Sequence, residues 1–434
     1  MFKCVFFLWY NLGGDNMLSE EVIERVSERL VNRIEQGNEY VLNKIGESIK
    51  KIGTLKNTDV HDLEQILKYG GNYEDIVKQL KKITKLNTKD IKKIFEEIAR
   101  NDYEFAEQFY KYRNKKYIPF DENTVLKKQV DTLATKTVKE FFKLTNRKAL
   151  GFGLVDKKTG KVKFKGLKRT YYDLIDEAIL NISQGKETFD DIMYKRLKEL
   201  GESGLKVIYE SGTTRRLDSA VRMNIKDGIR MLHNETQRQF GKEFDADGVE
   251  VTVHLNPAPD HEQVQGKQFS TVAPSENELS EFDKFQNDED CYSYDGTFFP
   301  ATSEETGRDR RSIGEYNCYH YVFSIVLGVN EPVYSNKQLQ EIIDKNNEGF
   351  EFDGKHYTNY EGTQLQRQIE TKIRELKEQQ ILGRSSGISD LAIESQKKIN
   401  QLSKKYKQLS KISNLPVKTK RMRMSGYRKI GTKK

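Results

Sequence analysis

Apolar residues in the first third of the chain recur at the three- and four-residue spacing of an amphipathic helix. The first stripe begins just after Ser19, which is placed to cap the helix, and consists of Val22, Val26, Leu30 and Ile34. The same spacing recurs in TDVHDLEQILKY, in NTKDIKKIFEEIA and, after Pro119, in DENTVLKKQVDTLATKTVKEFFKLTN. Pro119 is the only proline before Pro257, and a scarcity of proline favours long helices. We therefore predict a helical N-terminal region over residues 17–145, as a bundle or an extended stalk.

The next part of the chain continues in helices after one interruption. In LGFGLVDKKTGKVKFKGLK the turn sequence DKKTG separates two short apolar runs, which predicts a loop or a small hairpin. Helical spacing returns in RTYYDLIDEAILNISQG and ETFDDIMYKRLKELGESG, so we assign residues 146–209 to a helical connector with a short hairpin. A long helix follows, with an apolar stripe of Leu217, Val221, Ile225, Ile229 and Leu232.

The hydrophobic period then changes from helical to alternating. In VEVTVHL the residues Val249, Val251 and Val253 alternate with others, as expected for one buried face of a strand. NPAPDH predicts a proline-fixed turn, and GKQFS, YVFSIVL and FEFDGKHYT supply further short strands or loops. We predict a small α+β module over residues 210–335.

The C-terminal part returns to helical spacing. Glu370 and Arg374 form a favourable i,i+4 pair on a first helix, whose stripe is Leu365, Ile369, Ile373 and Leu376. GRSSG is expected to turn the chain into a second helix, striped by Leu391, Ile399, Leu402, Tyr406 and Leu409. We predict a helical hairpin over residues 336–415 and, after Pro416, a loose basic tail over 416–434. The fold class is therefore α+β, predominantly α.

Residues 1–16 are expected to stand apart from this fold. The apolar run from Cys4 to Tyr10 falls short of the about 20 residues of a membrane helix. It also lacks the Ala-x-Ala-like cleavage site of a signal peptide. The residues from Gly13 to Met17 can be encoded by a purine-rich bacterial ribosome-binding sequence followed by a start codon. We expect Met17 to be the initiator and residues 1–16 to be untranslated leader. The alternatives are a genuine disordered N-terminus and a membrane or export role.

Charge is distributed unevenly along the chain. The net charge is +8, but no acidic residue follows Glu394, while the 40 residues after it carry 14 lysines and arginines. The remainder is therefore net acidic, and only this end is an electrostatic candidate for polyanions. The candidates for contact with DNA phosphates are Lys418, Lys420, Arg421, Arg423, Arg428 and Lys429. The alternatives are a tail that docks to a protein partner and a solvated surface.

Histidine and cysteine gather in the predicted α+β module, which contains His254, His261, His320, Cys291 and Cys318. With three cysteines and no CxxC pair, the sequence indicates no disulfide framework and fits a reducing compartment. Cys318 and His320 are two residues apart and face the same way on an extended segment. One interpretation is a tetrahedral metal site from Cys318, His320, His261 and either Asp260 or Cys291. The other is that the histidines satisfy loop carbonyls and Cys318 packs as a small hydrophobe.

Three stretches, taken in order and with their spacing, resemble the phage minor capsid protein family. They are RRLDSAVRMNIKDGIRML (215–232), VEVTVHLNPAPDHEQVQGKQFS (249–270) and YNCYHYVFSIVLGVNEPVYS (316–335). YTNYEGTQLQRQIETKIRELK resembles the start of that family's C-terminal helical hairpin, so the resemblance covers roughly residues 165–415. The matching positions are His254, Pro259, His261, Gln265, Gly266, Lys267, Ser270, Asn317, Cys318, His320 and Pro332.

The resemblance implies a structural, non-enzymatic protein of a tailed-phage or prophage head that requires no cofactor. Such head morphogenesis proteins are low-copy components of the procapsid and associate with the portal or the inner shell. The implied partners are the portal and/or the major capsid protein, with packaged DNA as a further candidate through the basic tail and no membrane. The implied location is the virion head, and the bacterial cytoplasm during assembly.

Two other functions are compatible with the residues. The first is a metal-dependent hydrolase or nuclease, with His261, Cys318 and His320 as ligands and Asp260 or Glu262 as the base. The second is a non-viral DNA-binding or scaffold protein. Metal content tests the first alternative, and neighbouring genes for a terminase and a portal test the second.

Overall fold

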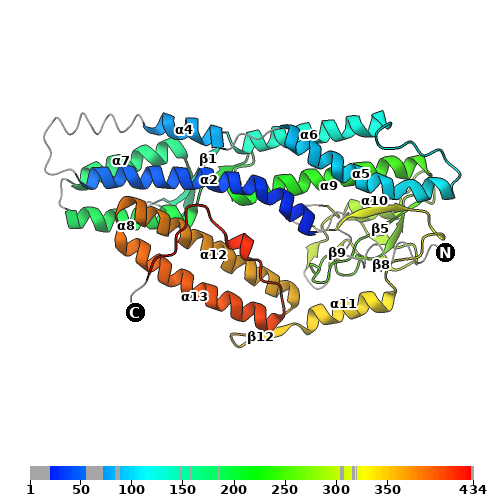
Figure 1. The fold of residues 1–434 in the computed structure, drawn as a ribbon. Helices are drawn as coiled ribbons and strands as arrows, with labels where there is room; N and C mark the ends of the chain where they lie inside the picture. The colour runs from blue at the N-terminus through cyan, green and yellow to red at the C-terminus, as the bar shows by residue number, and fades with distance from the viewer. Residues whose placement is uncertain are drawn as a thin grey trace. The chain divides into compact units, whose positions relative to one another are not determined.

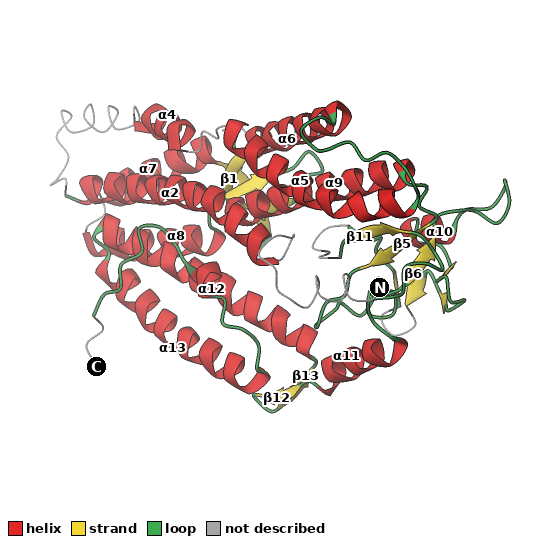
Figure 2. Ribbon diagram, turned by 45° about the vertical axis from the view of Figure 1, so that its right-hand side comes forward, coloured by secondary structure: helices red, strands yellow, loops and turns green. Residues whose placement is uncertain are grey.

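The computed structural model shows a predominantly helical α+β protein with small antiparallel sheets (Figures 1 and 2). The predicted fold class is confirmed. The structure describes residues 20–54, 72–83, 88–146, 149–156, 159–182, 186–303, 307–314, 318 and 320–431. The expected leader 1–16, the cap Ser19 and the helix expected at TDVHDLEQILKY lie outside these residues. The side chains of Val22, Val26 and Leu30 are also outside the described set.

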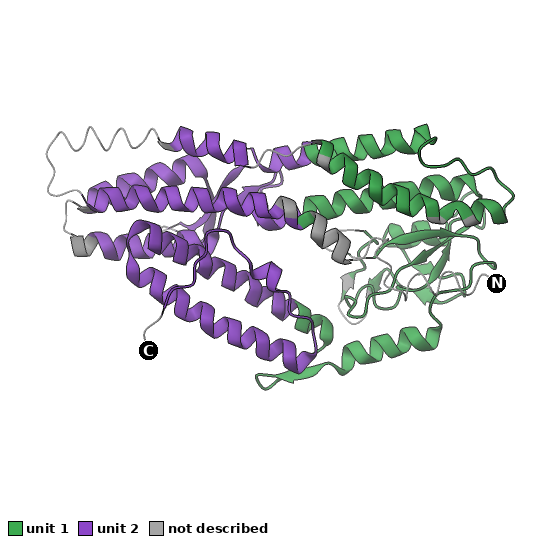
Figure 3. Cartoon of the chain, in the orientation of Figure 1, with its two compact units in different colours: residues 1–27, 87–138, 223–363 green, residues 28–86, 139–222, 364–434 purple. Residues whose placement is uncertain are grey.

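The chain divides into two compact units, coloured separately in Figure 3. Unit 1 comprises residues 1–27, 87–138 and 223–363, and unit 2 comprises residues 28–86, 139–222 and 364–434. Each unit therefore combines three segments that are distant in the sequence. Among the described helices, none has both the length and the apolar character required to cross a bilayer.

The helical part of unit 1 is built from α5 (Thr88–Tyr112), the first part of α6 (Thr124–Leu144) and most of α9 (Leu217–Glu243). The predicted stripe of α9 is confirmed, because all five of its residues are buried. Asn123 caps α6, since its side-chain oxygen accepts a hydrogen bond from the backbone N–H of Leu126 at 3.0 Å. Aromatic rings pack between α5 and α9 at centroid distances of 6.0 to 6.2 Å: Tyr103, Tyr110, Phe240 and Phe244.

The α+β part of unit 1 centres on a three-stranded antiparallel sheet of order β11-β5-β6. Its strands are β5 (Gly248–Val251), β6 (Gln268–Ser270) and β11 (Val322–Ile325). The strand predicted from VEVTVHL is confirmed, but it ends at Val251, after which Thr252 donates its N–H to the Tyr321 carbonyl. The strands predicted in GKQFS and YVFSIVL are β6 and β11.

Short elements complete the α+β part of unit 1. They are α10 (Glu281–Gln286), β7 (Cys291–Tyr292), β8 (Phe298–Phe299), β9 (Thr302–Ser303), β10 (Arg308–Asp309), α11 (Asn336–Glu348), β12 (Phe350–Phe352) and β13 (Lys355–Tyr357). The hairpin β12–β13 lies within the predicted strand segment FEFDGKHYT. One apolar core joins the sheet to α10 and β7–β8; its buried members include Val249, Val251, Phe269, Phe285, Cys291, Phe299 and Cys318.

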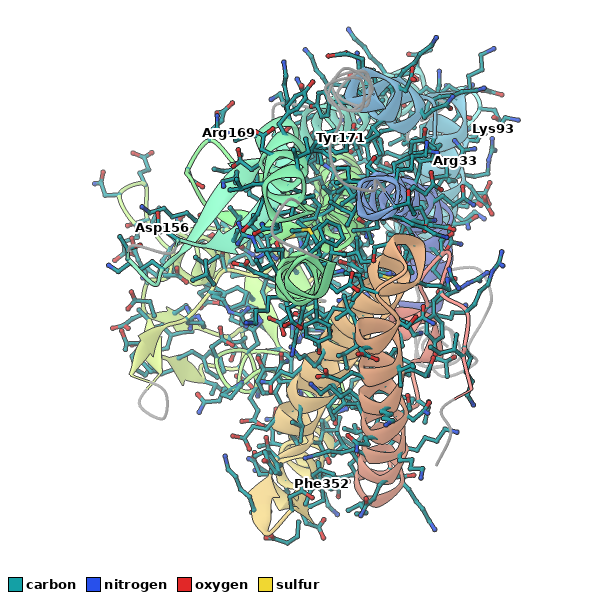
Figure 4. All side chains as sticks on the ribbon, turned by 90° about the vertical axis from the view of Figure 1, so that its left-hand side faces the viewer. Arg33, Lys93, Asp156, Arg169, Tyr171 and Phe352 are labelled. Atoms are coloured by element: carbon teal, nitrogen blue, oxygen red, sulfur yellow. The ribbon has the colours of Figure 1, made fainter. Side chains whose placement is uncertain are left out.

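Unit 2 contains a four-stranded antiparallel sheet of order β2-β1-β3-β4. The strands are β1 (Leu150–Val155), β2 (Val162–Gly166), β3 (Lys206–Ile208) and β4 (Thr214–Arg216). The pairing of β1 with β2 confirms the hairpin predicted around DKKTG. Asp156, labelled in Figure 4, stabilises its turn, because Oδ1 accepts the N–H of Thr159 at 3.0 Å.

The helices α7 (Leu167–Ile182) and α8 (Lys186–Ser203) pack on β1. Unit 2 also contains α4 (Asn72–Ile83) and most of α2 (Glu20–Gly53). Tyr171 of α7, labelled in Figure 4, has its hydroxyl 3.0 Å from Ser48 Oγ of α2. Both side chains are buried, so this hydrogen bond ties the two helices together.

The helical hairpin predicted over residues 336–415 is shorter than expected: it consists of α12 (Asn359–Ser386) and α13 (Ser389–Ser413), whereas α11, β12 and β13 occupy the residues before it. The turn is narrower than GRSSG, because α12 continues to Ser386 and only Gly387, at φ +82°, and Ile388 reverse the chain. The predicted Glu370–Arg374 pair is present as a charge interaction: burial raises the pKa of Glu370 overall, although the charge of Arg374 acts to lower that pKa, and each residue has another hydrogen-bond partner. Glu370 accepts a hydrogen bond from the Tyr406 hydroxyl at 2.7 Å, and Arg374 binds Asp218 at 2.9 Å. Both side chains are buried, where these partners compensate for lost hydration.

The C-terminal tail was expected to be loose, and this expectation is wrong. The described part of the tail, residues 416–431, is bound along the hairpin α12–α13. Its backbone carbonyls accept hydrogen bonds from hairpin side chains, from Lys377 to Met422, from Arg384 to Gly426 and from Gln380 to Arg428. The short 3-10 helix η1 (Thr419–Met422) lies in this segment, and Met424 is buried. Charge composition predicted solvation, but backbone carbonyls and uncharged side chains of the tail supply docking contacts; the Tyr427 hydroxyl, for example, donates to Gln396 at 3.0 Å.

Candidate functional site

The candidate site of unit 1 lies between the turn after β5 and the segment before β11. The turn is fixed by a hydrogen bond from the His261 N–H to the Ala258 carbonyl at 2.9 Å. It is closed by Gly266, which has φ +70° and donates its N–H to Val251 of β5. A Cβ at Gly266 would lie 2.5 Å from Leu339 and 2.8 Å from Val253, so only glycine fits both the space and the backbone angle.

The structure brings together three of the predicted ligands. Cys318 Sγ lies 3.7 Å from His261 Nδ1 and 3.5 Å from His320 Nδ1. The three ligand atoms all fall within 4.8 Å of one another. Cys318 is 9% exposed, His261 1% and His320 4%. One sulfur and two imidazole nitrogens therefore converge where the protein largely shields them from solvent.

Both histidines are oriented through their other ring nitrogen. His261 Nε2 donates to the Arg311 carbonyl oxygen at 2.7 Å, and His320 Nε2 donates to Gln265 Oε1 at 3.2 Å. Gln265 is in turn fixed by the backbone N–H of His254, which donates to the same oxygen at 2.8 Å. Since both acceptors can only accept, each Nε2 carries a proton, and Nδ1 is the ring nitrogen that faces the sulfur in both histidines.

The Cys318 thiol and the His261 imidazole shift one another's pKa. Burial raises the pKa of the Cys318 thiol, but the hydrogen bond and charge of His261 outweigh burial and lower it overall. Burial lowers the pKa of His261, whereas contact with Cys318 and the charge of Asp260 raise it overall. Burial and the neighbouring His254 and His261 bring the pKa of His320 well below its ordinary value. A metal ion binds a thiolate and neutral imidazoles, so its binding would displace the proton that the raised pKa of His261 favours on that ring.

Asp260, the predicted fourth ligand, is placed differently. Its carboxylate accepts two hydrogen bonds from the Arg311 guanidinium, at 2.6 and 2.9 Å. Burial raises its pKa, but the hydrogen bonds and charge of Arg311 lower it overall. Asp260 therefore supports the site in two ways: it holds the residue whose carbonyl orients His261, and its carboxylate lies 4.0 Å from His261 Nε2.

The other predicted members of the site lie outside the convergent group. Cys291, the alternative fourth ligand, is fully buried in the apolar core, where burial raises the pKa of its thiol. Glu262, the alternative base, is buried and accepts a hydrogen bond from Asn346 at 2.9 Å. His254 packs edge-on against the His320 ring at a centroid distance of 4.5 Å.

The remaining family-resemblance positions serve the surrounding framework. Lys267 donates to Asn336 at 2.6 Å and pairs with Asp295 at 3.3 Å, which ties the β6 entry to the start of α11. Ser270 donates its hydroxyl to the Val272 carbonyl at 3.0 Å. Pro259 is half-buried and Pro332 is exposed. Asn317 lies outside the described residues.

Sequence reasoning missed a second buried polar pair in unit 1. His233 Nδ1 lies 2.8 Å from Asp102 Oδ2, and His233 Nε2 lies 3.1 Å from the Val322 carbonyl oxygen. Asp102 is on α5, His233 is on α9 and Val322 begins β11. No local pattern signals the pair, because 131 residues separate its members.

The positively charged side chains of the basic tail in unit 2 differ in their exposure to solvent. Lys420, Arg423, Arg428 and Lys429 are exposed, whereas Lys418 and Arg421 are half-buried. Lys420 lies 3.2 Å from Glu28, and its side chain remains 69% exposed. The hydrogen-bonded backbone holds the four exposed cations on one ordered segment.

The fold and the site define a class: a helix-rich α+β protein with a buried cysteine–histidine cluster in one unit and a docked basic tail in the other. The model of the family described as Phage minor capsid protein 2 matches residues 18–411, and the chain belongs to this family. The match confirms the resemblance seen in the motifs and identifies a phage structural protein associated with the virion. No curated protein and no solved structure matched the chain.

Proposed function

We propose that the chain is a head morphogenesis protein that docks to the portal or the inner face of the capsid shell. The observation that carries this proposal is the family match over residues 18–411, which extends through both units. On this proposal the protein assembles in the bacterial cytoplasm and remains in the virion head. Its role is architectural and needs no catalytic step.

An exposed aromatic hairpin in unit 1 supports docking to a protein partner. Tyr292 and Phe298 are paired across β7–β8 with ring centroids 5.2 Å apart, although they are 45% and 47% exposed. Tyr294, in the same hairpin, is 51% exposed. Aromatic residues of this kind are enriched at the centres of protein interfaces, where binding shields them from water.

The exposed cations of the tail support contact with packaged DNA. Lys420, Arg423, Arg428 and Lys429 project from a segment whose backbone is already ordered. Binding of the DNA backbone therefore costs less chain entropy than it would for a free tail. Such contacts are independent of base sequence and weaken as salt concentration rises.

The geometry favours this architectural role over a metal-dependent hydrolase or nuclease. A hydrolytic metal centre keeps one coordination position open to substrate and places a base beside it. Here all three converging residues are buried, Asp260 is held by Arg311, and Glu262 accepts from Asn346. The cluster is better suited to holding segments of the fold together.

Co-expression with the portal and the major capsid protein of the same phage tests the docking proposal. We expect the chain to co-migrate with portal rings or with assembled shells on size-exclusion chromatography. Replacing Tyr292 and Phe298 together by serine should reduce this association without changing the melting temperature. The matched control replaces Val162 and Leu180 by serine, which are 64% and 62% exposed in unit 2. Undiminished association of the Tyr292/Phe298 variant would remove the hairpin from the proposal, and no association of the native chain would refute docking.

A further inference from the structure

We infer that Cys318, His261 and His320 form a transition-metal site, and that Zn²⁺ is the ion it fits best. The inference begins from geometry. In a tetrahedral zinc site with Zn–S of about 2.3 Å and Zn–N of about 2.0–2.1 Å, a sulfur and a nitrogen ligand lie about 3.6 Å apart. The two Cys318 Sγ–Nδ1 distances, 3.7 and 3.5 Å, bracket that value.

The atoms around the ligands are those that a metal site requires. A ligating histidine donates its other ring N–H to a carbonyl or carboxylate, which fixes the ring and raises its basicity. His261 and His320 each do so, to the Arg311 carbonyl and to Gln265 Oε1. The Nε2 proton of each ring is therefore bound elsewhere, and each ring turns its Nδ1 toward the Cys318 sulfur.

The types of ligand and their burial narrow the choice of metal ion. One thiolate and two imidazoles suit Zn²⁺ and other late transition-metal ions such as Cu²⁺, whereas Mg²⁺ and Ca²⁺ prefer oxygen ligands. The three residues are at most 9% exposed, so an ion bound between them would be shielded from solvent. Among the described residues the group has three protein ligands, and because all three are buried, a water in the fourth position of the tetrahedron would be shielded from any substrate.

The site would fasten the α+β part of unit 1. Cys318 and His261 are 57 residues apart, so one ion would close the long loop that contains α10 and the short hairpins. His261 lies in the turn that leads to β6, and His320 lies two residues before β11. Both strands pair with β5, so the ion would join the two flanking strands of the β11-β5-β6 sheet at one end.

Metal analysis of the untagged full chain tests this inference. After incubation with zinc and gel filtration, we expect about one zinc ion per chain, and chelation should lower the melting temperature. Cys318→Ala and His320→Ala should each weaken zinc binding by more than about 100-fold. Two control variants should keep the metal: Cys291→Ala, which removes a buried core thiol, and His356→Ala, which removes a histidine whose side chain is 52% exposed.

A spectroscopic measurement tests whether Cys318 binds the metal even if a variant that lacks a ligand fails to fold. The double variant Cys4→Ala/Cys291→Ala leaves Cys318 as the only thiol of the chain. Loaded with Co²⁺, it should show a thiolate-to-cobalt charge-transfer band and the strong visible bands of tetrahedral coordination. The inference is overturned if the native chain takes up no stoichiometric zinc, if Cys318→Ala retains the metal, or if the single-thiol variant gives no charge-transfer band.

Discussion

His233 Nδ1 lies 2.8 Å from Asp102 Oδ2, in a pair whose side chains are 0% and 1% exposed. The other nitrogen of His233 reaches the Val322 carbonyl oxygen, and the rings of Tyr321 and Phe323 pack edge-on against it. One imidazole therefore joins α5, α9 and β11 within unit 1. Removing one member of such a pair leaves its partner buried without compensation.

We predict that Asp102→Ala lowers the free energy of unfolding of unit 1 by about 3 kcal/mol. The matched control is Asp131→Ala, which breaks a surface pair with Lys92 in the same unit, where the side chains are 50% and 42% exposed. That change should cost less than about 1 kcal/mol. Urea denaturation followed by circular dichroism compares the two variants. Equal losses of stability would show that the buried pair contributes no more to the free energy of unfolding than the surface pair does.

A buried glutamate predicts a dependence of stability on pH. Glu250 of β5 accepts hydrogen bonds from Gln268 and Val333, but burial raises its pKa from 4.5 to about 7. Between pH 4.5 and 7 the folded state therefore holds more protons than the unfolded chain. This contribution to stability is complete below about pH 4.5 and is lost as the pH rises through about 7.

We predict that Glu250→Gln flattens the pH dependence of the melting temperature between pH 5 and 8. At pH 8 the variant should be more stable than the native chain, by on the order of 1–3 kcal/mol. Glu351→Gln is the control, because the Glu351 side chain is 70% exposed on β12. The account of Glu250 fails if the native profile and the Glu250→Gln profile have the same slope.

The residue that orients His320 provides a test of the metal site that leaves its ligands intact. Gln265→Leu removes the oxygen that accepts from His320 and from the His254 backbone, whereas Gln265→Glu keeps an acceptor there. We predict that the leucine variant binds zinc roughly 10- to 100-fold more weakly and that the glutamate variant stays near the native affinity. Competition with a chromophoric chelator measures both. Equal zinc affinities of the two variants would show that the acceptor at Gln265 does not contribute to metal binding.

The tail makes a quantitative prediction for DNA binding. Replacing Lys420, Arg423, Arg428 and Lys429 by glutamine should weaken binding to duplex DNA of any sequence. The slope of log K against log salt concentration should fall in magnitude by about 0.9 for each phosphate that the variant no longer neutralises. Fluorescence anisotropy at several salt concentrations gives both values. The control variant replaces four exposed helix lysines, Lys81, Lys82, Lys128 and Lys337. If both variants lose the same amount of affinity for DNA, the tail cations contribute no more to DNA binding than other exposed lysines do.

Much of the fold was predictable because it follows local periodicity. The α9 stripe from Leu217 to Leu232 and the partners α12 and α13 follow from three- and four-residue spacing. The β1–β2 hairpin and β5 follow from turn residues and alternation. Pairings between distant segments leave no such local trace. The pairing of β1 with β3 joins Leu150 to Val207, and no sequence pattern indicated it.

The candidate site was predictable in its residue types more than in its geometry. The two-residue spacing of Cys318 and His320 correctly placed both near one point, and His261 joined them through the turn after β5. The sequence did not show that Arg311 would engage Asp260 or that Gln265 would orient His320. Those contacts depend on tertiary packing. The docked tail was missed for a similar reason, because three of its hydrogen bonds with the hairpin use backbone carbonyls, which carry no residue-specific signal.

Quantitative mass spectrometry of gradient-purified proheads and virions tests the central claim most directly. The phage that encodes this chain would be compared with a derivative whose portal gene is deleted. The account predicts the polypeptide at low copy in native proheads and virions; its loss from portal-less proheads would assign docking to the portal, and its retention would assign docking to the shell. Absence of the polypeptide from both native particles would contradict the account.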